Sequence, residues 1–260
     1  DLVTVAIPND SHLDVVLKAL GAGKNVICEK PVALSTGDLQ KMFDAADRRG
    51  KLFTVHQNRR WDVDFLAMKQ LVQSGEIGPM LRIESRIHGS RGIPSDWRGE
   101  RVHGGGMLYD WGVHLLDQIL WMMPGAKIKS VYADLRNVIN FEVDDYFKIL
   151  MRFDNDIIAE VELGTYYLTD KMHDKWFERH WMIGGNQGSA YVDGFEPEGK
   201  IVRTTHLLQN VSGQRTMTAA GPTRSFGPPA EGTIVTEPLP TVTTCHEDYF
   251  ENYKKAYRGE

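Results

Sequence analysis

Short apolar runs alternate with helical patterns at the start of the chain, and this alternation constrains the fold more than any other feature. Strands are expected over residues 2–7, 25–28 and 52–55, and helices over 11–20 and 35–49. The first run is apolar at consecutive positions, which is typical of a strand buried on both faces of a parallel sheet. Ser35 and Asp38 stand at capping-box spacing before the second helix. The β-α-β-α-β order predicts right-handed crossovers and part of a Rossmann-like parallel sheet.

The pattern changes near Asn58 to Trp61, after which strands follow one another with turns between them. Further strands are expected over residues 80–88, 128–135, 145–153, 157–163, 180–183 and 189–192, and helices over 62–73 and 107–123. This order predicts an α+β region with an open, mostly antiparallel sheet, so we divide the chain into residues 1–58 and 59–260. Residues 204–240 are rich in Gly, Pro and Thr and are predicted to form long loops. The glycines of IGGNQGS at 183–189 are interpreted as a hairpin turn rather than a phosphate loop.

Both ends of the sequence suggest a fragment. A strand buried on both faces needs neighbours, so earlier βα units are expected before Asp1. At the other end, Thr244 and Glu247 have capping-box spacing before a helix that reaches the last residues. The alternative is a complete small protein with an unusual sheet edge.

Composition excludes several classes of protein. The chain has 30 Lys plus Arg against 35 Asp plus Glu, a net charge of −5, which disfavours a nucleic-acid partner. No apolar run reaches the length of a membrane span, and the first residues do not have the pattern of a signal peptide. Only two cysteines are present, too few for a disulfide framework, so the cytoplasm is the expected compartment.

Polar side chains follow each of the three N-terminal strands. The first strand is followed by Pro8 and the polar Asn9 and His12, the second by Glu29 and Lys30, and the third by His56, Gln57, Asn58, Arg59 and Arg60. Ligands of an open parallel sheet bind at the carboxyl ends of its strands, so these residues predict a site. The alternative for each cluster is a solvated turn with a helix cap, and capping is the favoured role of Asn9, Asp10 and Ser11. We hypothesise that Lys30-Pro31 is a cis bond that fixes the ammonium, which could serve as a base or as a cation.

A second cluster lies in the segment GGGMLYDWGVHLLD at 104–117. Gly104, Gly105 and Gly106 permit close approach of a ligand to the backbone before a helix. Asp110 and His114 are four residues apart on that helix, as an imidazole and the carboxylate that orients it must be. A purely structural Asp–His pair is the alternative. Asp110 and His114 with His103 or Glu29 could also bind a metal, but there is no spaced His or Cys pair, so no metal is predicted.

Four segments together resemble the Gfo/Idh/MocA oxidoreductases. They are IPNDSH at 7–12, EKPVAL at 29–34, QNRRW at 57–61 and GGGMLYDWGVHLLD at 104–117. The resemblance implies that residues 1–58 are a partial Rossmann domain binding NAD or NADP, and that residues 59–260 bind substrate and make subunit contacts. It also implies catalytic roles for Lys30, Asp110 and His114, and cofactor contacts for Pro8, Asn9, His12, Glu29, Lys30, Gln57, Trp97 and Arg98. An exposed loop pair is the alternative for Trp97 and Arg98.

The activity implied by this resemblance is reversible oxidation of a secondary alcohol on a sugar or polyol. In it, His114 oriented by Asp110 would take the hydroxyl proton and the Lys30 ammonium would hold the oxygen. Two alternatives are a glycoside hydrolase that uses a tightly held NAD and a non-catalytic sensor of a dinucleotide or sugar. A homodimer or homotetramer is expected. The Gly-rich dinucleotide fingerprint does not occur in this sequence, so the chain alone is predicted to bind the cofactor weakly or not at all.

Overall fold

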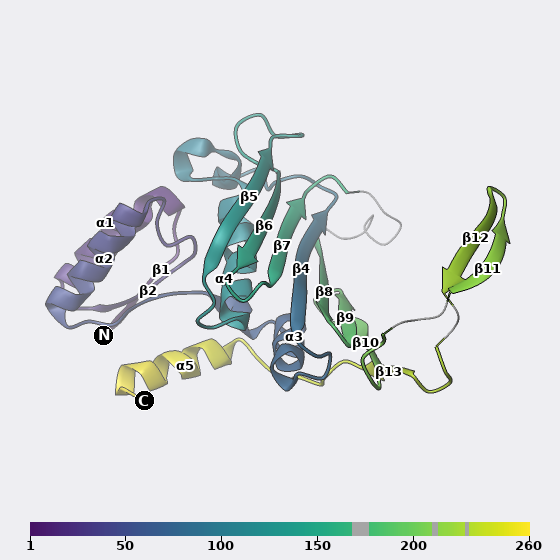
Figure 1. Ribbon diagram of the computed structural model, residues 1–260. Coiled ribbons are helices and arrows are strands. Elements are labelled where there is room, and N and C mark those ends of the chain that lie inside the picture. The colour runs from purple at the N-terminus through teal and green to yellow at the C-terminus, as the bar shows by residue number, and fades with distance from the viewer. Residues whose placement is uncertain (168–176, 210–212, 227–228) are drawn as a thin grey trace.

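The computed structural model describes residues 1–167, 177–209, 213–226 and 229–260 (Figure 1). The N-terminal part is a parallel sheet of order β1-β2-β3. Its elements are β1 (Leu2–Val5), α1 (His12–Gly21), β2 (Asn25–Cys28), α2 (Thr36–Arg49) and β3 (Phe53–Val55). The predicted β-α-β-α-β order is therefore confirmed. The Ser35 Oγ accepts a hydrogen bond from the Asp38 N–H at 3.1 Å, which confirms the predicted cap of α2.

The prediction that the first strand is buried on both faces is wrong. β2 is buried at every position, whereas β1 is exposed at Leu2 and Thr4 and fully buried only at Val5. The exposed Leu2 and Thr4 alternate with Val3 and Val5, so the exposure is confined to one face of β1. The core of this part lies between the sheet and its helices, where Val16, Leu20 and Met42 are completely buried.

The larger part of the chain forms an eight-stranded sheet of order β13-β10-β9-β8-β4-β7-β6-β5. Its strands are β4 (Met80–Gly89), β5 (Ile128–Arg136), β6 (Tyr146–Phe153), β7 (Ile158–Gly164), β8 (Phe177–Gly185), β9 (Gly188–Asp193), β10 (Glu198–Thr204) and β13 (Ile234–Pro238). β4 and β7 pair in parallel and the other neighbours are antiparallel, which confirms a mostly antiparallel sheet. The IGGNQGS segment is the turn between β8 and β9, as predicted.

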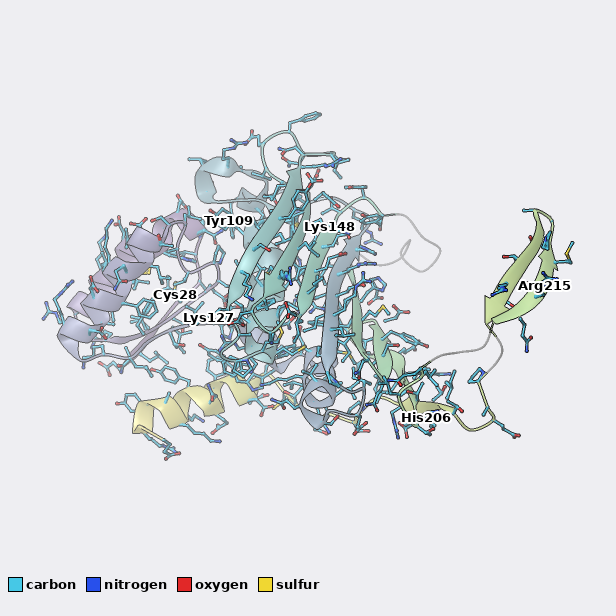
Figure 2. The ribbon with its side chains drawn as sticks, viewed as in Figure 1. Cys28, Tyr109, Lys127, Lys148, His206 and Arg215 are labelled. Atoms are coloured by element: carbon cyan, nitrogen blue, oxygen red, sulfur yellow. The ribbon has the colours of Figure 1, made fainter. Side chains whose placement is uncertain are left out.

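Two helices cover one face of this sheet. They are α3 (Val63–Ser74), which contacts β8, and α4 (Val113–Met122), which contacts β4 and β7. Their apolar side chains pack on alternate residues of the strands, such as Phe147 and Ile149 of β6, to form the main core. Lys148, labelled in Figure 2, lies between these two residues and points to the opposite face of the sheet.

Two local predictions are wrong, and a third, the helix over residues 107–123, is confirmed with a local difference. Within the predicted loops of residues 204–240, the chain forms a separate hairpin of β11 (Gly213–Thr218) and β12 (Gly221–Phe226), and then β13. The Thr residues of this region favour strands, and Gly221, at φ +111°, supplies the turn. The predicted helix over 107–123 begins with a π-helical turn at Leu108–Gly112. Thr244 and Glu247 do not form a capping box, because the Thr244 hydroxyl donates instead to the Asp248 carboxylate at 2.8 Å.

The last helix returns to the N-terminal sheet. α5 (Glu247–Arg258) buries Tyr249, whose hydroxyl donates to the Val55 carbonyl at the end of β3 at 3.2 Å. The proposed division at residue 58 stays a prediction, since one helix assigned to the second region contacts the first. Among the described residues, no helix has the length and apolar character that a membrane span requires.

Candidate active site

A cavity of about 480 Å³ opens where the ends of β2 and β3 meet the segment that leads into α4. Cys28 and Tyr109, labelled in Figure 2, mark the two chain segments that meet here. The lining residues are Glu29, Lys30, Asn58, Arg59, Pro94, Asp96, Arg98, Asp110, Trp111 and His114. Both sequence clusters predicted to carry chemistry therefore contribute to the same cavity.

Lys30 and Asp110 form the central contact of this cavity. The Lys30 Nζ donates to the Asp110 Oδ1 and to the Asp110 main-chain carbonyl, at 2.8 Å each. Both side chains are only 16% exposed, so the pair is shielded from bulk water. The Lys30-Pro31 peptide bond is cis, as hypothesised. The Arg98 Nε lies 3.5 Å from the same Asp110 oxygen, so two cations share one carboxylate.

The predicted hydrogen-bonded pair of Asp110 and His114 does not form. Asp110 lies in the π-helical turn, where the spacing per turn is wider than in an α-helix, so a separation of four residues does not align the two side chains. The Asp110 carboxylate pairs with Lys30 instead. The His114 Nδ1 is buried and has no hydrogen-bond partner among the residues that the structure describes.

The His114 ring is neutral at physiological pH. Burial lowers its pKa well below the ordinary value, and the positive charges of Lys30 and Arg59 lower it further. A neutral imidazole has one nitrogen that can accept a proton. His114 thus provides an acceptor at the wall of the cavity, without the carboxylate that was expected to orient it.

Glu29 and His56 form a second pair at the edge of the sheet. The His56 Nδ1 lies 2.5 Å from the Glu29 Oε1, and the Lys30 N–H donates to the other carboxylate oxygen at 3.3 Å. Burial opposes ionisation of Glu29, but His56 and Lys30 together outweigh it, so the pKa of Glu29 lies below its usual value. The Tyr249 ring of α5 packs edge-on against His56, with 4.4 Å between the ring centroids.

Arg59, which belongs to the predicted site cluster, and Trp111, for which no site role was predicted, form a wall of the cavity. The Arg59 guanidinium carbon lies 4.0 Å from the centre of the Trp111 ring, and Arg59 also pairs with Asp62 at 3.0 Å. Trp111 has the helical spacing of an apolar packing residue, so its position in the sequence does not indicate a binding site. Asp96 and Pro94 lie in a segment without regular periodicity, where no pattern could have identified them.

The predicted cofactor residues fall into two groups. Glu29, Lys30 and Arg98 line the cavity, whereas the lining does not include Pro8, Asn9, His12, Gln57 or Trp97. The Asn9 side chain does not cap α1, as was favoured, but donates to the Gly104 carbonyl at 2.9 Å. Both nitrogens of His12 lie against main-chain carbonyls, at 3.0 Å from Pro31 and 2.9 Å from Ile7. Asn9 and His12 thus hold the loops that carry the site.

Trp97 and Arg98 belong together. They lie in a short 3₁₀ turn at Trp97–Gly99, and the Arg98 guanidinium carbon is 4.6 Å from the centre of the Trp97 ring. Asp96 pairs with the Arg98 Nη1 at 2.8 Å. The pair is therefore fixed at the rim of the cavity, with Arg98 turned toward Asp110.

The donor and acceptor set at this edge fits a bound nicotinamide group better than a metal. No group of three or more His, Cys, Asp or Glu side chains with metal-binding geometry occurs in the described part of the chain. The Gln57 Oε1 and the His114 Nδ1 are buried and have no hydrogen-bond partner among the described residues. Gln57 follows β3 of the parallel sheet, whereas His114 lies on α4.

Comparison with known proteins agrees with this geometry. Residues 1–57 match the family model described as an oxidoreductase family with an NAD-binding Rossmann fold, and residues 65–191 match the GFO/IDH/MocA C-terminal domain. The crystal structure of an NAD-binding protein from Listeria innocua is 39% identical with a TM-score of 0.88, over 100% of this chain and 72% of that one.

Two curated relatives add detail. Oxidoreductase C115.03 of Schizosaccharomyces pombe is 34% identical over 76% of this chain and 54% of its own length. The scyllo-inositol 2-dehydrogenase (NADP(+)) IolW of Bacillus subtilis is 33% identical over 59% of this chain and 43% of its own length. The chain thus spans about half the length of these relatives. Since both of its parts match models of one family and a solved relative aligns over its full length, the chain belongs to the Gfo/Idh/MocA oxidoreductases.

Proposed function

We propose that this chain carries the substrate side of an NAD- or NADP-dependent dehydrogenase that oxidises a secondary alcohol of a sugar or polyol. The observation that carries the proposal is the shielded Lys30–Asp110 pair, which lines the same cavity as the His114 imidazole. A fixed cation beside a free proton acceptor is what removal of a hydroxyl proton requires.

The two residues have separate tasks in this reaction. A lysine ammonium has three donors, and two of those on Lys30 are used by Asp110, so one remains to hold the substrate oxygen. As that oxygen loses its proton, the positive charge of Lys30 stabilises the developing negative charge. His114 accepts the proton in its neutral form. When bound, the oxidised nicotinamide supplies the acceptor for the hydride that leaves the alcohol carbon.

The lining of the cavity supports a neutral, polyhydroxylated substrate. Three cations and three carboxylates line it, and each cation is already within ion-pair distance of a carboxylate. A charged substrate would have to break one of these ion pairs in order to bind. The hydroxyl groups of a neutral substrate can hydrogen-bond to the paired side chains without breaking them. Trp111 offers an apolar surface of the kind on which the carbon side of a sugar ring packs. The name of the relative IolW, an inositol dehydrogenase, supports the same substrate class.

The proposal also includes the oligomeric state of the protein and its cellular compartment. The face of the large sheet opposite α4 carries exposed apolar side chains, among them Tyr132 of β5 and its cross-strand neighbour Leu150 of β6, at 66% and 39% exposure. An uncovered sheet face of this kind supports a homodimer or homotetramer. Two cysteines and no predicted disulfide support a cytoplasmic location.

The test is a dehydrogenase assay on the whole protein, with NAD and with NADP, against a panel of inositol isomers, hexoses and glucosides. We expect reduced nicotinamide to accumulate with at least one polyol, and to accumulate about 10²- to 10⁴-fold more slowly in the Lys30→Met variant. Lys41→Met is the matched control, because Lys41 is an exposed lysine on α2 paired only with Asp38.

The assay also separates the alternatives. Turnover of a glucoside without net accumulation of reduced nicotinamide would identify the glycoside hydrolase. Dinucleotide binding with no turnover of any compound in the panel would favour the sensor and contradict the dehydrogenase.

A further inference from the structure

A second cavity, of about 440 Å³, lies between α3 and α4 behind the turn that follows β3. That turn is the 3₁₀ segment Asn58–Trp61, in which Arg59 lines the first cavity and Arg60 lines the second. The residues lining the two cavities do not overlap within the described part of the chain. The size of the second cavity suits a small organic molecule.

The charges in this cavity do not balance. The Arg60 guanidinium donates to both oxygens of Asp117, from Nε at 2.7 Å and from Nη2 at 2.6 Å. This bidentate pair uses the one carboxylate that lines the cavity. Lys69 is the second cation, and no carboxylate of the described residues lies within ion-pair distance of its Nζ. One positive charge therefore remains without a counter-ion.

Lys69 lies beside a second cation and against an aromatic ring. Its Nζ lies 4.9 Å from the centre of the Trp121 ring, and the Arg60 guanidinium carbon lies 3.9 Å from the same ring. Burial, and then the charge of Arg60, lower the pKa of Lys69 below its usual value. A negative group in the cavity would relieve both effects. Gln73, one helical turn after Lys69 on α3, adds an amide donor on the same side.

The rest of the lining is apolar and exposed. Leu120 and Trp121 at the end of α4 are 45% and 43% exposed, and Pro124 continues this surface. A ligand with a charged end and a flat apolar body matches both halves of the cavity: the charge would lie at Lys69 and Gln73, and the body against Leu120, Trp121 and Pro124.

We propose that this cavity is a binding site for a small aromatic carboxylate, held by the Lys69 ammonium and by the apolar surface around Trp121. The proposal does not depend on the dehydrogenase activity, since none of its residues lines the first cavity. A carboxylate is favoured over a larger anion because a single uncompensated cation faces a shallow apolar surface.

The test uses benzoate as the probe and benzamide as its neutral counterpart, with the protein labelled by 5-fluorotryptophan. Loss of one ¹⁹F resonance in Trp121→Phe assigns Trp121, and Trp111→Phe assigns the tryptophan that reports on the first cavity. We expect benzoate to shift the Trp121 resonance with a Kd on the order of 1 mM, and benzamide to bind at least about tenfold more weakly.

Variants at Lys69 test whether its ammonium binds the carboxylate of benzoate. Lys69→Ala should weaken benzoate binding at Trp121 by about tenfold or more, and Lys69→Arg should restore most of it. Lys41→Ala, at an exposed lysine of α2, is the control and should leave binding unchanged. The proposal is overturned if benzoate leaves the Trp121 resonance unmoved, or if the shift persists undiminished in Lys69→Ala.

Discussion

The Lys30 ammonium and the Asp110 carboxylate lie 2.8 Å apart, although 80 residues separate them in the sequence. This contact connects the end of β2 to the π-helical turn before α4, and it closes one side of the cavity that His114 also lines. The sequence predicted that the Asp110 carboxylate orients the His114 imidazole. In the structure this carboxylate pairs with the Lys30 ammonium instead. The consequences for activity differ between the two residues.

Removal of either member of this pair should slow hydride transfer, but by different amounts. Lys30→Met removes the cation that holds the substrate oxygen, and we expect turnover of the whole protein to fall by about 10²- to 10⁴-fold. Asp110→Asn keeps the main-chain carbonyl as a partner of Lys30, so a smaller fall of roughly 10- to 100-fold is expected. Steady-state kinetics measure both. Wild-type turnover in Asp110→Asn would show that the carboxylate does not position the cation.

The low pKa of His114 determines the pH dependence of the reaction. His114 must be neutral to accept the proton, and its pKa lies well below 6.5, so kcat/KM for alcohol oxidation should begin to fall only below pH 6.5. His114→Ala should lower kcat by about 10²- to 10⁴-fold and remove this acidic limb. An acidic limb centred above pH 7, or one that survives in the variant, would assign the proton to another group.

The sequence predicted most of the regular structure because the local patterns are strong. The strand over residues 25–28 has the bounds that the structure shows, and the helix that follows Ser35 has the cap that its spacing indicates. These features depend on residues close in the chain. Only the family resemblance predicted that Lys30 and His114 lie at one cavity, because hydrophobic periodicity does not relate residues so far apart in the sequence.

The errors have physical causes too. The Asp110–His114 pairing assumed α-helical spacing, and a π-helical turn leaves no mark in the apolar periodicity. Asn9 looked like a helix cap because its residue type is typical of caps, but its tertiary contact with Gly104 takes precedence. Within the described part of the chain, β11 and β12 pair only with each other, and β11 shows no regular alternation of buried and exposed residues that would have indicated a strand.

Gly104 should be intolerant of substitution because two loops meet at it. Its φ is +72°, and a Cβ there would lie 2.5 Å from the Leu34 Cδ2 and 3.3 Å from the Asn9 Cβ. Gly104→Ala should therefore lower the free energy of unfolding by about 2–3 kcal/mol in urea titrations. Gly50→Ala is the matched control, since Gly50 has φ +57° but no atom within 4 Å of its Cβ position. An equal loss in both variants would mean that backbone conformation alone is responsible.

His88 should make the protein sensitive to mild acid. Burial, with the charge of His180, lowers the pKa of His88 from 6.5 to about 4, and its buried Nε2 has no partner among the described residues. Between pH 6.5 and pH 4 the unfolded chain binds a proton at this histidine that the folded chain does not, so stability falls as the pH falls through that window. The shift corresponds to about 3 kcal/mol at most, and solvent screening of the partly exposed ring makes the effect smaller.

The His88→Gln variant should lose less of its free energy of unfolding between pH 7 and pH 4.5 than the wild type does, by roughly 1–2 kcal/mol in urea titrations. His206→Gln, at an exposed histidine, is the control and should follow the wild type. Parallel pH profiles for the wild type and His88→Gln would show that another group governs the acid sensitivity.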